Sequence, residues 1–114
     1  MTAYEKGDVV LVPFPFSNQI DHKKRPAVII SSTAYNNVSQ DVVIMAITSQ
    51  IGKPIVIGEC LITNWQEAGL LKPSAIKTAI STIEQSLIIK RMGKLSQSDL
   101  LSMEGALKEF LGLK

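Results

Sequence analysis

The sequence of 114 residues contains a single cysteine and a single histidine. Cys60 has no second cysteine with which to form an intramolecular disulfide, and adding His22 gives too few ligands for a zinc site built from protein side chains. Cys60 follows Glu59 in an apolar segment, a setting typical of a buried small side chain. We therefore expect neither a cysteine hydrolase nor a protein-bound metal.

Long hydrophobic runs are also missing, although 46% of the residues are hydrophobic. The apolar segments are short and interrupted by polar residues, so none is long enough to span a membrane. The first eight residues, MTAYEKGD, lack the apolar segment and small-residue cleavage site of a secretory signal, which favours the cytoplasm. The length predicts a single domain over residues 1–114, without repeats or linkers.

Charge of one sign is scarce as well, because the net charge is only +2. So small an excess does not by itself indicate nucleic-acid binding, since a solvated lysine face explains it equally well. The cations are nevertheless unevenly placed, with Lys23, Lys24 and Arg25 directly before Pro26. The proline ring pushes Arg25 toward an extended backbone and so directs the strand that follows.

Two β-branched segments flank this basic group. Val9–Val12 predicts one strand, and Ala27–Ile30 predicts a second that ends at two serines. Pro13 and Pro15 have no amide hydrogen to donate to a neighbouring strand, so the first strand must end, or become an edge, near Val12. The sequence therefore predicts a polar loop whose cations lie at the mouth of a strand.

Short apolar segments continue through the chain. Thr33–Gln40 predicts a connection, because its asparagines and serine favour turns. Further strands are predicted at Asp41–Thr48, which is apolar on both faces and therefore central, at Ile55–Ile57 continued by Glu59–Ile62, at Ala75–Ile83, and at Leu87–Met92. In the third of these segments the expected inward residues are Ile76, Ile83 and either Ala79 or Ile80.

Two segments have features of helices. Thr63–Gln66 fits a capping box, in which a hydroxyl and a glutamine exchange hydrogen bonds with the first turn, and Gly69 suits the end of such a short helix. Trp65 within it is expected to fill the core. Short strands at close intervals with few helices indicate a mainly β protein, as a small curled sheet or barrel.

The second helix is predicted at the C-terminal end. Ser96 and Asp99 form a plausible pair at its start, and Gly112 suits its end. Gly105 inside it costs about 1 kcal/mol relative to alanine, which suggests a close contact there. Apolar residues follow at spacings of three and four, as in an amphipathic helix, at Leu100, Met103, Leu107, Phe110 and Leu111.

Five ordered motifs resemble those of the MazF/PemK family of toxin endoribonucleases. They are GDVVLV at Gly7–Val12, RPAVIIS at Arg25–Ser31, MAITS at Met45–Ser49, GLLKPS at Gly69–Ser74 and GKLS at Gly93–Ser96. The resemblance implies an SH3-like barrel and a toxin of a type II toxin–antitoxin system that cleaves single-stranded RNA without a metal or cofactor. It also implies a homodimer and a cognate antitoxin whose disordered tail fills the RNA groove.

Cleaving RNA without a metal requires the 2′-hydroxyl to lose a proton, the charge on five-coordinate phosphorus to be stabilised, and the leaving 5′-oxygen to be protonated. Arg25 suits the second task, because a guanidinium is permanently charged and matches two phosphate oxygens. Thr48 and Ser49 offer hydroxyls at a strand end. The resemblance assigns the catalytic pair to Arg25 and Thr48. The residue pattern alone also allows Arg25 to be a solvated loop residue and Thr48 to be only a cap at the end of its strand.

Other residues near this pair are candidates for binding RNA. Phe14 and Phe16 flank the predicted loop, and they either stack on unpaired bases or pack the mouth of the barrel. Lys23 and Lys24 are expected to bind phosphates, with an affinity that falls as salt rises.

Two segments depart from the family pattern. Where members often carry G-x-E-Q, this chain has Ser17–His22, and Asp21 and His22 are candidates there for the acid and the base. Where relatives place an acid, a glutamine or an arginine, this chain reads TAISTI at Thr78–Ile83. These departures leave two alternatives open. One is an SH3-like module that binds RNA or an antitoxin-like peptide without cleaving RNA, and the other is a plain protein-interaction domain.

Overall fold

The computed structural model describes residues 4–13 and 23–114. The described strands form one antiparallel sheet in the order β4–β5–β3–β2–β1–β6. The strands are β1 (Asp8–Pro13), β2 (Lys24–Ile29), β3 (Asp41–Thr48), β4 (Cys60–Ile62), β5 (Ser74–Glu84) and β6 (Lys90–Lys94). The other elements are the helices α1 (Thr33–Val38) and α2 (Gln97–Leu111) and the short 3₁₀ helix η1 (Gln85–Leu87).

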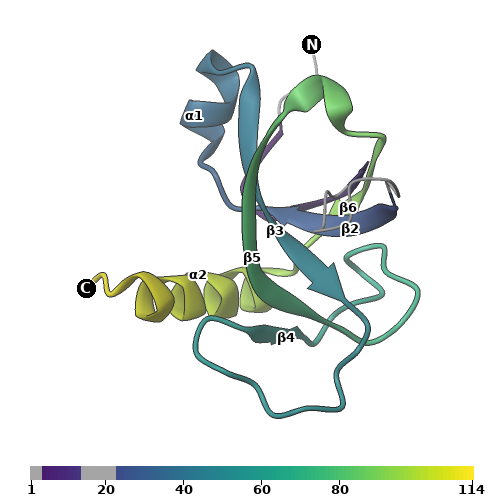
Figure 1. Ribbon diagram of the computed structural model, residues 1–114, viewed down its shortest axis with the longest axis vertical. Coiled ribbons are helices and arrows are strands. Elements are labelled where there is room, and N and C mark those ends of the chain that lie inside the picture. The colour runs from purple at the N-terminus through teal and green to yellow at the C-terminus, as the bar shows by residue number, and fades with distance from the viewer. Residues whose placement is uncertain (1–3, 14–22) are drawn as a thin grey trace.

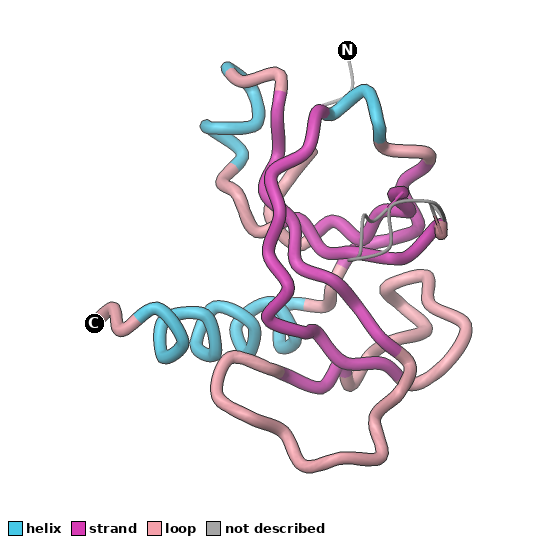
Figure 2. Tube along the Cα trace, in the orientation of Figure 1, coloured by secondary structure: helices cyan, strands magenta, loops and turns pink. Residues whose placement is uncertain are grey.

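The sheet is curled. Figure 1 shows the long β5 upright while β2 and β6 lie across it, and the tube in Figure 2 follows the strands around this bend. The mainly β architecture with a C-terminal helix agrees with the sequence prediction, whereas the internal helix lies at residues 33–38 and not at residues 63–69 as predicted. No described helix is long and apolar enough to cross a membrane.

Both faces of the central strands are buried, because successive side chains of a strand point to opposite faces. One face joins the apolar cluster that packs beneath α2, formed by Val9, Val28, Met45, Ile47, Cys60, Ile62, Ala68, Leu70, Ile76, Leu95 and Met103. The other face joins a second cluster, formed by Val10, Val12, Ala27, Ile29, Val42, Ile44, Ala46 and Ile83. The prediction that Asp41–Thr48 forms a central strand, apolar on both faces, is confirmed.

The connection predicted at Thr33–Gln40 is wrong, because residues 33–38 form α1. The hydroxyl of Ser32 accepts a hydrogen bond from the amide of Tyr35 at 3.1 Å and so caps the helix. Asn36, which favours turns in isolation, is buried and donates to the carbonyl oxygens of Tyr4 and Ser31. These long-range bonds outweigh its local preference.

The strand predicted at Ile55–Ile57 is also wrong. Ile55, Val56 and Ile57 are 46%, 58% and 64% exposed and lie in an irregular loop. The loop turns at Gly58, whose φ is +95°, and the amide of Glu59 donates to the carbonyl of Val56. Their β-branched side chains therefore lie outside the sheet, and β4 begins only at Cys60.

Residues 63–69 form turns in place of the predicted helix, and Asp99 of α2 accepts from the first two of their amides. The buried carboxylate of Asp99 accepts hydrogen bonds from the amides of Thr63 at 3.0 Å and Asn64 at 2.8 Å. In a capping box the first of these amides would bond to Gln66. Trp65 is half-buried against the apolar cluster beneath α2, as expected of a core residue.

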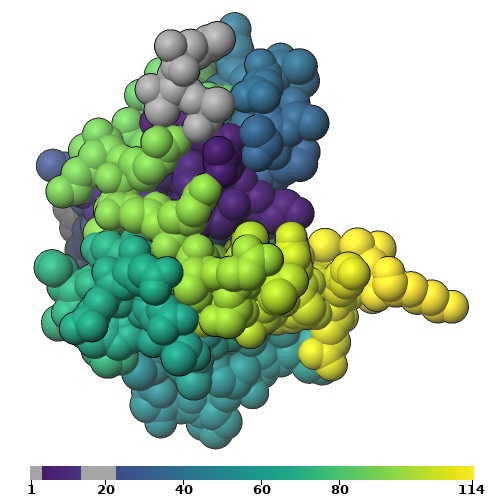
Figure 3. All heavy atoms as spheres, turned by 180° about the vertical axis from the view of Figure 1, so that it is seen from behind, coloured from purple at the N-terminus to yellow at the C-terminus, as the bar shows by residue number. Residues whose placement is uncertain are grey.

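The start and end of α2 are confirmed. The hydroxyl of Ser96 accepts from the amide of Asp99 at 3.2 Å, and Gly112 ends the helix with a φ of +72°. Of the predicted apolar face, Met103 is buried, whereas Phe110 and Leu111 are 41% and 51% exposed. Figure 3 shows the last residues of the chain projecting beyond the body of the molecule.

Strand β5 confirms the predicted strand but not all of its inward residues. Ile76 and Ile83 are buried, whereas Ala79 and Ile80 are both exposed. The pairing is irregular between these residues: Ile76 pairs with Ile47 and Ile80 with Met45, which leaves residues 77–79 opposite Ala46 alone. Such a bulge breaks the alternation on which the prediction depended.

We expect Asp99→Ala to lower the free energy of unfolding by about 2 to 3 kcal/mol, since two backbone amides lose a buried carboxylate acceptor. The measurement is equilibrium unfolding in urea. Glu109→Gln, which also removes one carboxylate but at an exposed position of α2, is the matched control and should shift the free energy by less than about 0.5 kcal/mol. Equal small effects would contradict this role of Asp99.

A second prediction contrasts two glycines. Gly69 has a φ of +83°, and a Cβ there would lie 2.1 Å from the carbonyl oxygen of Met92, so Gly69→Ala should destabilise by about 3 kcal/mol or more. At Gly105, a Cβ would meet nothing within 4 Å outside its own stretch of helix, so the close contact suggested by the sequence is wrong. Gly105→Ala should stabilise by about 1 kcal/mol. Thermal or urea unfolding of the two variants checks both signs.

Candidate functional site

Arg25 and Thr48 meet at one end of the sheet. Strand β2 begins at Lys24, so Arg25 lies within the strand and pairs with Val12 of β1. The ladder between β2 and β3 starts at the pair Ala27–Ala46. Continued by two residues, this register brings Arg25 beside Thr48, the last residue of β3. Both side chains therefore leave the same face of neighbouring strands.

Two hollows open on either side of this pair. The first, called here the Leu70 hollow, has a volume of about 350 Å³ and an apolar lining completed by Leu11, Pro26, Ile47, Leu70, Leu71 and Met92. The second, the Lys77 hollow, has a volume of about 280 Å³ and is lined by Lys77, Ala46 and Ala79 besides the shared residues. The shared residues are Arg25, Ile47, Thr48 and Gln50.

The charged residues of the two hollows are cations. Arg25 lines both, Lys72 lines the Leu70 hollow, and Lys77 lines the other. Among the described residues, no carboxylate lines either hollow. A site with this lining attracts anions and offers apolar surface beside them, as an RNA strand with its phosphates and bases requires.

The hydroxyl of Thr48 is oriented by the chain that follows. Its Oγ1 accepts a hydrogen bond from the amide of Gln50 at 3.1 Å. A hydroxyl that accepts through its oxygen keeps its hydrogen for donation to a further acceptor. Thr48 therefore caps the strand end, and the same oxygen can donate to an anion in the hollow; Ser49, beside it, is exposed and lines the Leu70 hollow.

The other predicted binding residues have different outcomes. Lys23 and Lys24 are exposed, and Lys24 pairs with Pro13 at the start of β2, one residue from Arg25. Phe14, Phe16, Asp21 and His22 lie outside the described residues.

Sequence reasoning missed Lys72, Lys77 and Gln50. Lys72 belongs to the GLLKPS motif at Gly69–Ser74, so that motif could have identified it. For Lys77 no signal exists in the sequence, because only the bulge in β5 brings it beside Ala46 and the strand end.

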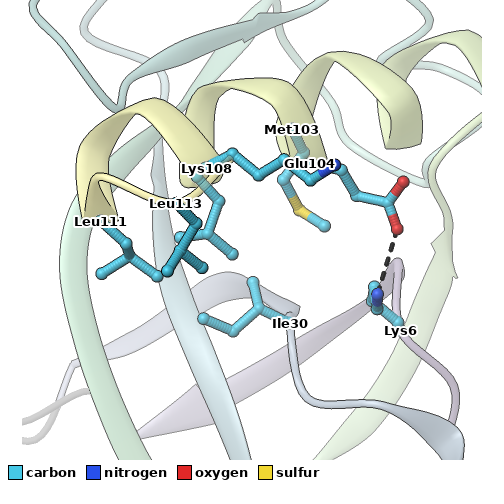
Figure 4. Close-up of a pocket in the computed structure, with 8 residues that line it drawn as sticks. Lys6, Ile30, Met103, Glu104, Lys108, Leu111 and Leu113 are labelled. Atoms are coloured by element: carbon cyan, nitrogen blue, oxygen red, sulfur yellow. Dashed lines mark hydrogen bonds and ion pairs between the residues drawn. The ribbon is translucent and has the colours of Figure 1, made fainter.

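A third cavity, the α2 groove, is a poorer anion site. It has a volume of about 260 Å³ and is lined mainly by Ile30, Met103, Leu107, Leu111 and Leu113. Figure 4 shows Lys6 and Glu104 facing each other across its edge, with Nζ and Oε2 3.1 Å apart. Glu104 itself lines this groove, so a phosphate there would face an acid as well as Lys6 and Lys108.

A fourth hollow, beside β6, is lined by the acids Glu5 and Asp8 as well as by Arg91 and Lys94. The guanidinium of Arg91 lies 3.1 Å from the buried carboxylate of Asp8 and 4.9 Å from the centre of the Tyr4 ring, and Lys94 forms an ion pair with Glu5. Lys94 lowers the pKa of Glu5, chiefly by hydrogen bonding, and Glu5 raises that of Lys94. These pairs hold the N-terminal segment to β6.

Cys60 lines neither the Leu70 hollow nor the Lys77 hollow. Burial raises the pKa of the Cys60 thiol, and the charge of Asp99 adds to this effect, so the thiol stays protonated and inert near neutral pH. The prediction that Cys60 is buried is confirmed. Within the described part of the chain, no three His, Cys, Asp or Glu side chains come together as a metal site.

Several solved structures have the same fold. A MazE–MazF complex from Deinococcus radiodurans has a TM-score of 0.77 and 20% identity, covering 99% of this chain and 100% of that one. An endoribonuclease in complex with its cognate antitoxin, from a mycobacterial species, has a TM-score of 0.75 and 19% identity, covering 100% of this chain and 98% of that one. Mycobacterium tuberculosis toxin MazF-mt6 has a TM-score of 0.76 and 18% identity, covering 94% of this chain and 98% of that one.

These structural likenesses confirm the predicted MazF-type barrel, and the sequence comparison extends them to a family. No curated protein sequence matches the chain. Residues 5–111, however, match the family described as PemK-like, MazF-like toxin of type II toxin–antitoxin system. The chain therefore belongs to the PemK-like, MazF-like toxins of type II toxin–antitoxin systems.

Proposed function

We propose that this toxin is an endoribonuclease that cleaves single-stranded RNA by attack of a 2′-hydroxyl on the adjacent phosphate, without a metal or cofactor. The observation that carries the proposal is the meeting of Arg25 and Thr48 between two hollows whose described charged residues are cations. An extended strand that crosses this point puts one phosphate against the pair and a neighbouring nucleotide over each hollow.

In this reaction Arg25 stabilises the transition state. Attack by the 2′-oxygen forms a new P–O bond, builds negative charge on the non-bridging oxygens, and breaks the bond to the 5′-oxygen, which leaves a 2′,3′-cyclic phosphate. A guanidinium donates to two such oxygens at once. Thr48 assists by donating its hydroxyl hydrogen to one oxygen, with Gln50 holding Oγ1 in place.

Asp21 and His22 are the proposed acid and base. One removes the 2′-hydroxyl proton and the other protonates the leaving oxygen, and an imidazole suits either role near neutral pH. Phe14 and Phe16 are proposed to stack on bases. Lys23, Lys24 and Ser49 are proposed to bind the strand on the side of the β2 entry, a role that the exposure of the two lysines supports.

The proposed partners follow from the family and its solved members. Related solved structures include an endoribonuclease with its cognate antitoxin and MazE–MazF complexes. We infer a cognate antitoxin for this toxin, which blocks the Arg25–Thr48 site, and a homodimer as the active form.

The first test is cleavage of a long single-stranded RNA in excess EDTA. Wild-type protein should give discrete fragments with cyclic-phosphate ends. Arg25→Ala should reduce kcat by about 100-fold or more, the typical cost of losing one transition-state donor. Thr48→Ser should retain more activity than Thr48→Ala, because serine keeps the hydroxyl. Lys108→Ala, at the α2 groove, is the control and should cleave as wild type does.

The rival function is an SH3-like module that binds RNA or an antitoxin-like peptide without cleaving it. The absence of acid, glutamine and arginine at Thr78–Ile83 favours this alternative. It predicts salt-dependent RNA binding by wild-type protein with the RNA left intact. If the protein neither bound nor cleaved RNA, both RNA functions would be contradicted. A protein-interaction domain would then remain.

A further inference from the structure

Lys77 is carried into the site by an irregularity of β5. The pairs Ile47–Ile76 and Met45–Ile80 leave residues 77–79 of β5 opposite the single residue Ala46 of β3. Bulges of this kind bend the strand and redirect side chains. Here the result is that Lys77 and Ala79 line the same hollow as Arg25 and Thr48.

The ammonium group of Lys77 is held from one side. Its Nζ lies 2.6 Å from Oε2 of Glu59, whose side chain is only 10% exposed, whereas that of Lys77 is 47% exposed. Oε1 of Glu59 accepts from the amide of Val56 at 3.2 Å. The carboxylate is thus fixed to the loop before β4, and the lysine extends from it toward solvent.

This pair leaves Lys77 able to bind an anion. An ammonium has three N–H donors, and the carboxylate oxygen uses one of them. The hydrogen bond from Lys77 lowers the pKa of Glu59, as does that from Val56, so the carboxylate stays ionised near neutral pH and keeps its hold on the lysine.

We propose that Lys77 is a phosphate-binding residue of the toxin, which contacts an RNA phosphate next to the one held by Arg25, with Glu59 as its positioning residue. This inference rests on the proposed function, because it names a second phosphate contact for the same substrate. It gives the Lys77 hollow a polar role, in contrast to the apolar lining of the Leu70 hollow.

The test measures binding of a single-stranded RNA that carries 2′-O-methyl groups and cannot be cleaved, across a series of salt concentrations. Loss of one phosphate contact lowers the slope of log K against log salt by about 0.7 for a single strand. We expect this decrease for both Lys77→Gln and Lys77→Met, and an unchanged slope for Lys77→Arg, which keeps the charge.

Cleavage of unmodified RNA provides the second readout. Lys77→Gln should raise KM roughly tenfold, since a charged hydrogen bond is lost in both ground and transition states, and it should leave kcat within about twofold. Lys108→Gln, which removes the same charge at the α2 groove, should change neither KM nor the salt slope. Unfolding curves verify that each variant is folded under the assay conditions.

The outcomes separate this inference from the proposed function. If wild-type protein cleaves RNA but Lys77→Gln and Lys77→Met keep the wild-type slope and KM, the role of Lys77 is overturned and the endoribonuclease stands. If Lys77→Arg loses as much as Lys77→Gln, the side chain acts through structure and not through its charge, which also overturns the inference. Failure of wild-type protein to cleave any RNA contradicts the proposed function itself.

Discussion

Both faces of β1, β2 and β3 are covered by apolar clusters, one packed beneath α2 and the other on the opposite face of the sheet. Burial on both faces leaves no room for polar side chains along the middle of these strands, since each unpaired polar group would cost free energy. The first positions open to a ligand are the strand ends. Arg25 and Thr48 occupy two of them, on neighbouring strands. The site is thus located by the extent of the core as much as by its own residues.

The wall of the Leu70 hollow depends on a second set of contacts. Asp99 anchors residues 63–64 to the start of α2, and the turns that follow lead to Gly69 and Leu70. Gly69 packs against the backbone of Met92 so closely that no side chain fits. These contacts place the loop before β5 over the end of β3. Lys72 belongs to this loop and is placed there too. A helix cap on one side of the molecule therefore supports the site on the other end of the sheet.

Much of this architecture is predictable from the sequence. The strands at residues 8–13, 41–48 and 74–84, and both ends of α2, follow from apolar patterning and capping residues. Arg25 and Thr48 were predicted as a pair from motifs, and the register of β2 and β3 accounts for their lining the same two hollows. Two of the failures share a physical cause: tertiary hydrogen bonds override local preference. Asn36 turns a predicted connection into α1, and Asp99 removes the amides of a predicted capping box.

Lys77 is the residue that no local pattern could have indicated. Asp41 pairs with Glu84 and Thr48 with Ala75, so the eight residues 41–48 of β3 lie opposite the ten residues 75–84 of β5. Two extra residues must therefore be accommodated, but the sequence does not reveal where. The structure places them opposite Ala46, at the edge of the site. The departure of Thr78–Ile83 from the family pattern lies in and beyond this bulge. The chain thus lacks the usual polar groups there and has a lysine, held by a carboxylate, at the bulge.

The most direct measurement is a crystal structure of the protein with a single-stranded RNA that carries a 2′-O-methyl group at the scissile position. It tests whether Arg25 and Thr48 together hold the reacting phosphate between the two hollows. We expect a phosphate oxygen within hydrogen-bonding distance of the Arg25 guanidinium and another within reach of Thr48 Oγ1, with bases directed to either side. An RNA bound in the α2 groove, or along β6 with Arg25 facing solvent, would contradict this arrangement.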